Sequence, residues 1–206
     1  TFGAPDTVHG TYTDEIELLD KRASLAGLRF ISVPIRHMGT ERCVDVMRRM
    51  CDALLERGVE IHMRTPGKEV ITENGKVVAV TTEAGDTLPA QAVVLAPGRE
   101  GASWLENTAR ALHLSLARNP VDLGLRIEVP AAVLQPITDL VYESKFVYFS
   151  KAFDDKIRTF CMCPYGEVST EFAGDVLTVN GHSFANHKTA NTNFALLVSK
   201  SFTEPF

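Results

Sequence analysis

Two cysteines, Cys161 and Cys163, are the residues whose type and spacing most plainly allow chemistry. They lie one residue apart in the run RTFCMC (158–163), which predicts a strand because aromatic and β-branched residues favour one. Residues i and i+2 of a strand share a face, so both thiols are expected on one side of a sheet. Next to a cleft, a stabilised and exposed thiolate would contact substrate or do redox chemistry. The competing interpretation, which we favour, is two small core residues without a strained disulfide between them.

A polar stretch follows further along the chain and offers hydrogen-bonding groups rather than nucleophiles. Its amide-bearing and hydroxyl residues are Asn180, Gly181, Ser183, Asn191 and Asn193. They either line a substrate pocket or hydrogen-bond the backbone of a loop. His37 and Arg36 are candidates for holding an anionic ligand, and solvent-facing loop residues are the alternative.

The strong catalytic and metal motifs are missing from these 206 residues. The sequence has no G-x-G-x-x-G, P-loop, G-x-S-x-G or H-E-x-x-H pattern. Cys161-x-Cys163 has no second cysteine pair that would complete a zinc site, and the spacing of His182 and His187 is weak evidence for a metal. We therefore predict no metal and cannot assign a catalytic residue from motifs.

The stretch around which the rest of the sequence is organised runs from Lys68 to Gly98. Asn74-Gly75 and Gly85-Asp86 punctuate alternating apolar runs, which predicts an antiparallel β-meander. The run 92–96 (AVVLA) is apolar on both faces and predicts a strand covered on both sides. It ends at Pro97-Gly98, where the chain must turn.

Further elements are predicted on both sides of this segment. Apolar spacing and a first-turn or capping signal predict helices over 14–27, from Thr40 to Gly58, and from a Ser103–Glu106 capping box onward. Short alternating runs predict strands over 28–35, 59–63, 122–129, 145–150, 158–163 and 175–179. We expect a domain change near residue 115, where helical patterns give way to strands.

Composition narrows the class of protein. A net charge of −5 argues against a general nucleic-acid or anionic-membrane surface, and no membrane-spanning apolar run or secretory leader is evident. Four cysteines without a dense framework fit a reduced, cytoplasmic setting. The chain starts at Thr1 and ends in Glu-Pro-Phe, so we expect an internal piece of a longer polypeptide.

Several blocks of the sequence together resemble a flavoprotein family. HMGT, VEIHM, the whole meander, GLRIEVP, RTFCMCPYGEV and VNGHSFANHKTANTNFALLV occur in that order along nearly the whole chain. This order is similar to the uncharacterised FAD-dependent dehydrogenases of the glutathione-reductase-like flavoprotein superfamily. The family has an upstream G-x-G-x-x-G segment and a downstream FAD segment, and the sequence lacks both. Where the superfamily has Ala-Thr-Gly, it has Ala96-Pro97-Gly98, which removes a hydroxyl and an N–H donor.

The resemblance implies cofactor-binding positions. Val70 matches a main-chain contact to adenine, whereas Ala96, Pro97 and Gly98 match the turn beside the cofactor, where glycine allows close approach. Gly39 and Thr40 open a helix whose free amides would hold an anion or a polar ligand edge. For substrate, we single out His37, Cys161, Cys163, Asn180, Ser183 and Asn191. Each position also has an ordinary structural interpretation as sheet core, turn or helix start.

The expected fold is mixed α/β to α+β. Residues 1–114 form a partial FAD-domain lobe with a leading helix and strand, and residues 115–206 form a mainly antiparallel substrate-domain portion. The expected function is the central part of an FAD-dependent dehydrogenase, inactive and without FAD as this piece alone. Its partners would be a small-molecule substrate and an electron donor or acceptor. The alternatives are a non-enzymatic small-ligand or partner-binding module, and a thiol redox protein using Cys161 and Cys163.

Overall fold

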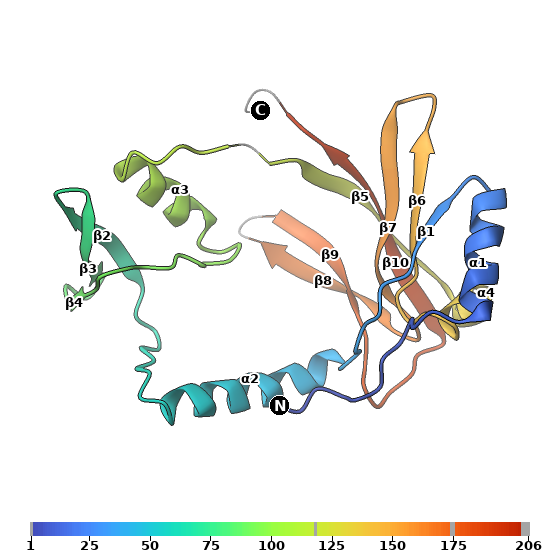
Figure 1. Ribbon diagram of the computed structural model, residues 1–206, viewed down its shortest axis with the longest axis horizontal. Coiled ribbons are helices and arrows are strands. Elements are labelled where there is room, and N and C mark those ends of the chain that lie inside the picture. The colour runs from blue at the N-terminus through green and yellow to red at the C-terminus, as the bar shows by residue number, and fades with distance from the viewer. Residues whose placement is uncertain (1, 118, 174–175, 203–206) are drawn as a thin grey trace. The chain divides into compact units, whose positions relative to one another are not determined.

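The computed structural model describes residues 2–117, 119–173 and 176–202, and its fold is mixed α/β with antiparallel sheets (Figure 1). The chain forms two compact units. Among the described residues, one unit comprises 2–53, 119–172 and 176–202, and the other comprises 54–117 and 173. The predicted division into a cofactor-domain lobe before residue 115 and a substrate-domain portion from it onward stays a prediction.

The first unit is built on a five-stranded sheet in the order β1-β6-β7-β10-β5. The strands are β1 (Arg29–Ile31), β5 (Val121–Pro130), β6 (Lys145–Ser150), β7 (Asp155–Cys163) and β10 (Asn191–Lys200). Every neighbouring pair is antiparallel, and β10 pairs with β5 along its whole length. The strands predicted over 122–129, 145–150 and 158–163 are confirmed, and the one predicted over 28–35 is shorter.

Helix α1 (Asp14–Leu25) packs on this sheet and supplies the described core cluster of the unit. The Thr13 side chain accepts a hydrogen bond from the Ile16 amide, and three acidic residues in the first turn favour the positive helix end. Ile16 and Ala23 then bury their side chains with Phe30 and Val141, while Gly27 ends the helix region at φ +74°. Figure 1 shows α1 beside β1, at the edge of the sheet.

Three further elements of this unit were not predicted. They are α4 (Ala131–Thr138), β8 (Glu167–Ala173) and most of β10. Pro136 inside α4 and the amide-rich start of β10 are loop signals that packing overrides, because β10 lies between two partner strands. β8 pairs with β9 (Val176–His182), so the strand predicted from 175 is confirmed over its described part, and Asp175 itself lies outside the described residues.

The second unit contains the predicted β-meander. Its strands are β2 (Gly67–Glu73), β3 (Lys76–Thr82) and β4 (Thr87–Pro89), in that order. Asn74 and Gly75 both have positive φ, the backbone of a tight hairpin turn, as Asn-Gly predicts. Helix α3 (Ala102–Ala111) follows, and the Trp104 indole donates to the Lys68 carbonyl at 3.0 Å. The predicted capping box is wrong, because Gly101 is the N-cap and Ser103 already lies inside the helix.

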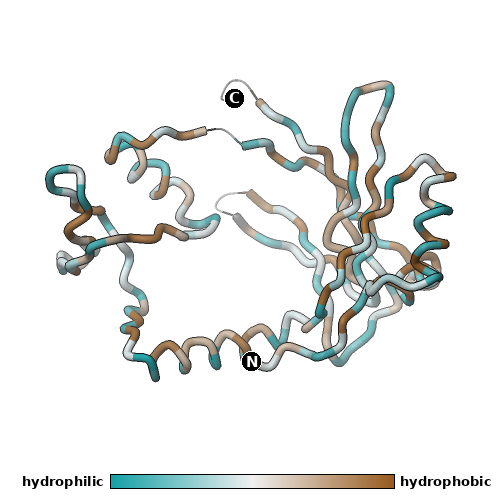
Figure 2. The backbone as a smooth tube through the Cα atoms, in the orientation of Figure 1, coloured by the Kyte–Doolittle hydropathy of each residue, from teal (hydrophilic) through white to brown (hydrophobic). Residues whose placement is uncertain are grey.

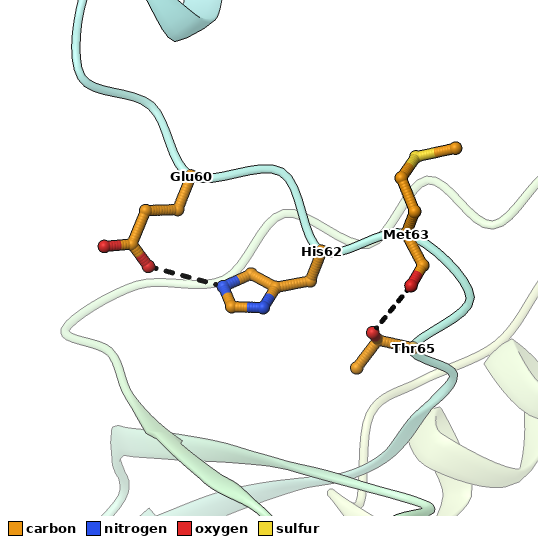
Figure 3. Close-up of polar contacts among 4 residues, drawn as sticks. All are labelled: Glu60, His62, Met63 and Thr65. Atoms are coloured by element: carbon orange, nitrogen blue, oxygen red, sulfur yellow. Dashed lines mark hydrogen bonds and ion pairs between the residues drawn. The ribbon is translucent and has the colours of Figure 1, made fainter.

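Two predicted strands of the second unit are absent from its described residues. Residues 59–63 form an irregular segment, in which His62 contacts Glu60 at 3.4 Å and the Thr65 hydroxyl donates to the Met63 carbonyl (Figure 3). The doubly covered strand over 92–96 is also wrong, since the segment has no assigned strand pairing and Val94 is 92% exposed. An apolar run forms a buried strand only where another strand pairs with its backbone. The described residues pair no strand with this segment.

Helix α2 (Thr40–Leu55) is confirmed, yet none of its residues is buried. Its apolar residues recur along the helix between hydrophilic ones, as Figure 2 shows. Val44 and Met47 are 60% and 58% exposed, so the predicted amphipathic face exists but covers no described core. No helix in the described part of the chain is long and apolar enough to cross a membrane.

Candidate functional site

A β-bulge near the end of β7 decides which side chains reach each face of the five-stranded sheet. Phe160 pairs with Ala195 and Cys163 pairs with Asn193, so two residues of β7 lie opposite one residue of β10. Cys161 takes up the extra residue with φ +47°, a left-handed backbone more usual for glycine. The alternation of faces is therefore interrupted at Cys161.

One face of the sheet is apolar. Met162 and its neighbour across the sheet, Phe194, line a cavity of about 570 Å³ together with α1 and α4. Thr159 lines the same cavity, which places residues 159 and 162 on one side of β7. An unbulged strand would put them on opposite sides. This cavity offers van der Waals contact rather than polar chemistry.

The opposite face carries a compact polar cluster around Arg126 of β5. The Arg126 Nε and Nη2 donate to the Asn193 Oδ1 at 2.8 and 2.5 Å. Nη2 also donates to the Cys161 carbonyl at 2.7 Å and to the Cys163 Sγ at 3.3 Å. The guanidinium thus joins the middle of β5 to the end of β7 and the start of β10 at the bulge.

Strand β9 approaches this cluster through Gly181. A side chain at this position would meet the Arg126 Nη2 and the Asn193 Oδ1, so only glycine allows the backbone so close. Asn193 is 0% exposed, and its Nδ2 has no hydrogen-bond partner among the described residues. Asn180 and Gly181, which were expected either to line a substrate pocket or to hydrogen-bond a loop backbone, are part of strand β9, and Gly181 lies against Arg126.

The two thiols lie together at this cluster, with their Sγ atoms 4.0 Å apart. Cys161 is partly exposed and Cys163 is 3% exposed. The hydrogen bond from the Cys163 thiol, aided by Arg126, lowers the pKa of Cys161 to about 6. The same contact and burial raise the pKa of Cys163. Cys161 is therefore the group of the pair that carries a thiolate near neutral pH.

His37 and Tyr142 form a second polar group in the same unit. Their rings stack with centroids 4.0 Å apart, and the Tyr142 hydroxyl lies 2.8 Å from the His37 Nε2. Burial lowers the pKa of His37 and raises the pKa of Tyr142 to about 12, so both rings are uncharged near neutral pH. They line a cavity of about 680 Å³, whose wall also includes residues 184–188.

Gly39 and Thr40 meet the loop that follows β9. A Cβ on Gly39, which has φ +78°, would lie 2.5 Å from the Ala185 nitrogen. The Thr40 amide and hydroxyl both point to the Ser183 carbonyl, at 3.2 and 3.3 Å. Thr40 is the first helical residue of α2, and its amide is occupied rather than free for an anion. At Gly39 the backbone therefore lies close to Ala185 of the protein itself.

The predicted substrate residues of the polar stretch separate into two groups. Ser183 lies beside His37 and Tyr142, and its hydroxyl interacts with the Tyr142 phenol. Asn180 donates to Glu171 at 3.2 Å, and Asn191 donates to Glu128 at 2.9 Å. Each amide therefore makes a polar contact between two neighbouring strands, β9 and β8 for Asn180 and β10 and β5 for Asn191.

The second unit holds the other predicted cofactor residues. Val70, paired with Val80, lines a cavity of about 450 Å³ between β2 and α3. Ala96 is exposed, and Gly98 has φ +68° with no atom within 4 Å of the position of a Cβ. Pro97 is half-buried between them. The corner is open on the described structure, not packed inside a core.

The structure thus brings Cys161 and Cys163 together, and His37 with Ser183, as separate groups. Arg126 and Tyr142 organise those two groups, and neither was predicted from the sequence. The signal for Arg126 was its position in the strand GLRIEV, where Arg126 and Glu128 share the polar face. No pattern marked Tyr142, because its role arises from contacts distant in sequence.

Comparison with known proteins gives one family. Residues 7–156 match the family model described as flavin-containing amine oxidoreductase. The match covers more than half of the chain and includes parts of both compact units. It ends within β7, before Cys161. No curated protein matches the chain.

Proposed function

Because the chain belongs to the flavin-containing amine oxidoreductase family, we propose that it forms one wall of the cofactor cleft and the substrate sheet of an amine-oxidising flavoenzyme. The full-length protein is an FAD-dependent oxidoreductase. The observation that carries the proposal is the match over residues 7–156. This range includes the whole meander, strands β1, β5 and β6 of the five-stranded sheet, and the first residues of β7. The resemblance in the remaining blocks supports the finer proposal of a dehydrogenase of the glutathione-reductase-like superfamily.

The corner from Ala96 to Gly98 fits a cofactor contact. Its main chain is exposed, and Gly98 presents no side chain toward the open space around it. Ala96 and Gly98 would therefore hold FAD by close backbone approach, with Val70 contributing from β2. The helix start at Thr40 supports this role less, because its amide already bonds to Ser183.

The cavity beside His37 and Tyr142 is the proposed place for the substrate. Both rings are neutral near pH 7, so they supply hydrogen-bonding atoms without a charge of their own. The cations on the same wall are Arg42, which donates to Asn186, and Lys188, which lies over the Tyr165 ring. Residues 184–188 complete the wall, and the Ser183 hydroxyl interacts with the Tyr142 phenol. A bound flavin accepts the hydride or electrons, whereas these residues bind and orient the substrate and exclude water.

The visible absorption spectrum of the purified full-length protein tests the proposal. We expect the two visible bands of an oxidised flavin, and their loss when an amine substrate is added without oxygen. A panel of primary, secondary and tertiary amines identifies the substrate class. A colourless protein that gains no flavin on incubation with FAD would instead favour the non-enzymatic binding module.

Substitution of Gly98 tests the cofactor wall directly. Gly98→Ala places a methyl group on the open corner, and we expect FAD to bind roughly tenfold more weakly, a loss of about 1.4 kcal/mol. Gly85→Ala is the matched control, because Gly85 also has positive φ and open space at its Cβ but lies in the β3–β4 turn. Equal flavin content in the two variants would remove Gly98 from the site.

A further inference from the structure

The thiol pair at the bulge is not used by the proposed flavin chemistry, yet its geometry is that of a reactive site. Cys161 is partly exposed, its carbonyl accepts a hydrogen bond from Arg126, and its Sγ lies 4.0 Å from the Cys163 Sγ. Reactive cysteines typically occupy electropositive and partly exposed surroundings of this kind. Cys43 and Cys51 are exposed, and neither forms a disulfide in the described structure.

We propose that Cys161 and Cys163 form a peroxide-reactive thiol pair, in which Cys161 is the attacking thiolate and Cys163 is the resolving thiol. The oxidant is a hydroperoxide. The Cys161 thiolate attacks one peroxide oxygen, the O–O bond breaks, and the products are a Cys161 sulfenic acid and hydroxide. The Cys163 thiol then attacks the sulfenic sulfur, an S–S bond forms and water leaves. Two electrons pass from the two sulfurs to the peroxide.

The order of the two cysteines follows from their surroundings. Cys161 is the more accessible thiol, and Cys163 lies behind it, within reach of the Arg126 Nη2. The charged and titratable groups that act on Cys161 are Cys163, Arg126 and Glu143; the first two lower its pKa, and Glu143 raises it. Tyr142 is also close enough for the two thiols to raise its pKa. The balance favours the Cys161 thiolate.

The bulge also explains why the pair would be reversible. In a regular strand, thiols at i and i+2 are too far apart for an unstrained bond. At the bulge the regular register is interrupted, and the two Sγ atoms lie 4.0 Å apart. A bridge across one intervening residue still carries strain. Strained disulfides are more easily reduced than structural ones, so ordinary thiol reductants should restore the pair.

Intact mass and thiol trapping in the full chain test the proposal independently of any flavin. In a Cys43→Ser, Cys51→Ser background, one equivalent of hydrogen peroxide should remove the mass of two hydrogen atoms, and dithiothreitol should restore it. With Cys163→Ala added, dimedone should label Cys161. With Cys161→Ala added instead, Cys163 should stay unmodified.

The rate gives a second, quantitative outcome. At pH 6 about half of the Cys161 thiol is ionised, and after allowance for lower nucleophilicity we expect alkylation roughly tenfold faster than for free cysteine. Arg126→Gln should slow it, whereas Arg158→Gln, on the same strand as the pair but bound to Asp122, should not. If the Arg126 variant is misfolded by near-ultraviolet circular dichroism, the cysteine variants decide. Dimers, modification at Cys163 first, or a rate no faster than free cysteine would overturn the proposal.

Discussion

At the scale of single residues, the stacked His37–Tyr142 pair makes stability depend on pH. Burial lowers the pKa of His37 below its ordinary value of 6.5, so the folded state binds this proton less readily than the unfolded state does. The contribution is fully present above pH 6.5 and is lost as the pH falls through the folded pKa. We expect the free energy of unfolding to fall in that acidic range, and His37→Gln to flatten the fall.

Urea unfolding across this pH range measures the effect. His62→Gln is the control, because His62 lies in the other unit beside Glu60 (Figure 3). That variant should keep the slope of the parent. A His37→Gln protein with an unchanged slope would show that protonation of His37 is not coupled to folding.

The residue scale also shows where sequence reasoning stops. The spacing of Cys161 and Cys163 predicted both thiols on one side of the sheet, and their Sγ atoms lie 4.0 Å apart. The reason was incomplete, because a bulge rather than regular alternation sets their positions. Arg126 could not be assigned from one sequence, since its partners Asn193 and Cys163 come from strands far apart along the chain.

At the scale of elements, α2 is a helix whose apolar face adds little stability to the described fold. Met47 is 58% exposed, so Met47→Glu should change the free energy of unfolding by less than about 0.5 kcal/mol. It should also reduce binding of an apolar dye. Ile16→Glu in α1 is the contrasting control, because Ile16 is 2% exposed and its loss should cost more than about 4 kcal/mol. Similar costs for the two variants would mean that α2 is packed.

Elements with local signals were predictable, and elements that depend on a neighbour were not. The Asn74-Gly75 hairpin and helix α1 follow from turn and capping chemistry within a few residues. The strand expected over 92–96 fails because pairing requires another strand, which the described residues do not supply. β10 forms a strand although its amide-rich start resembles a loop, because β5 and β7 pair with it on its two sides.

At the scale of the whole molecule, two compact units predict local rather than global responses to mutation. Trp104→Phe removes the indole hydrogen bond to the Lys68 carbonyl, which should cost about 1 kcal/mol. Hydrogen exchange should then quicken in β2 and α3 while β10 keeps its protection. Thr159→Val, which removes contacts to the Phe146 amide and Ser144 carbonyl, is the reciprocal test. Equal changes in both units after either substitution would contradict separate stability.

The flavoprotein assignment was predictable at this scale because many short blocks in one order carry more information than any one motif. The family match confirms an FAD-dependent oxidoreductase without settling the narrower dehydrogenase family. Composition contributed little, since a net charge of −5 fits most proteins of this size.

The extra residue at Cys161 has a practical consequence for anyone aligning or grafting this strand. A template without the insertion would keep Thr159 in place. It would place Met162 on the face of the sheet that carries Arg126, and Cys163 in the apolar cavity. Every downstream position of β7 would then be read on the wrong side. A gap placed opposite Cys161 restores the correct parity, and only then does the pattern of matched side chains have meaning.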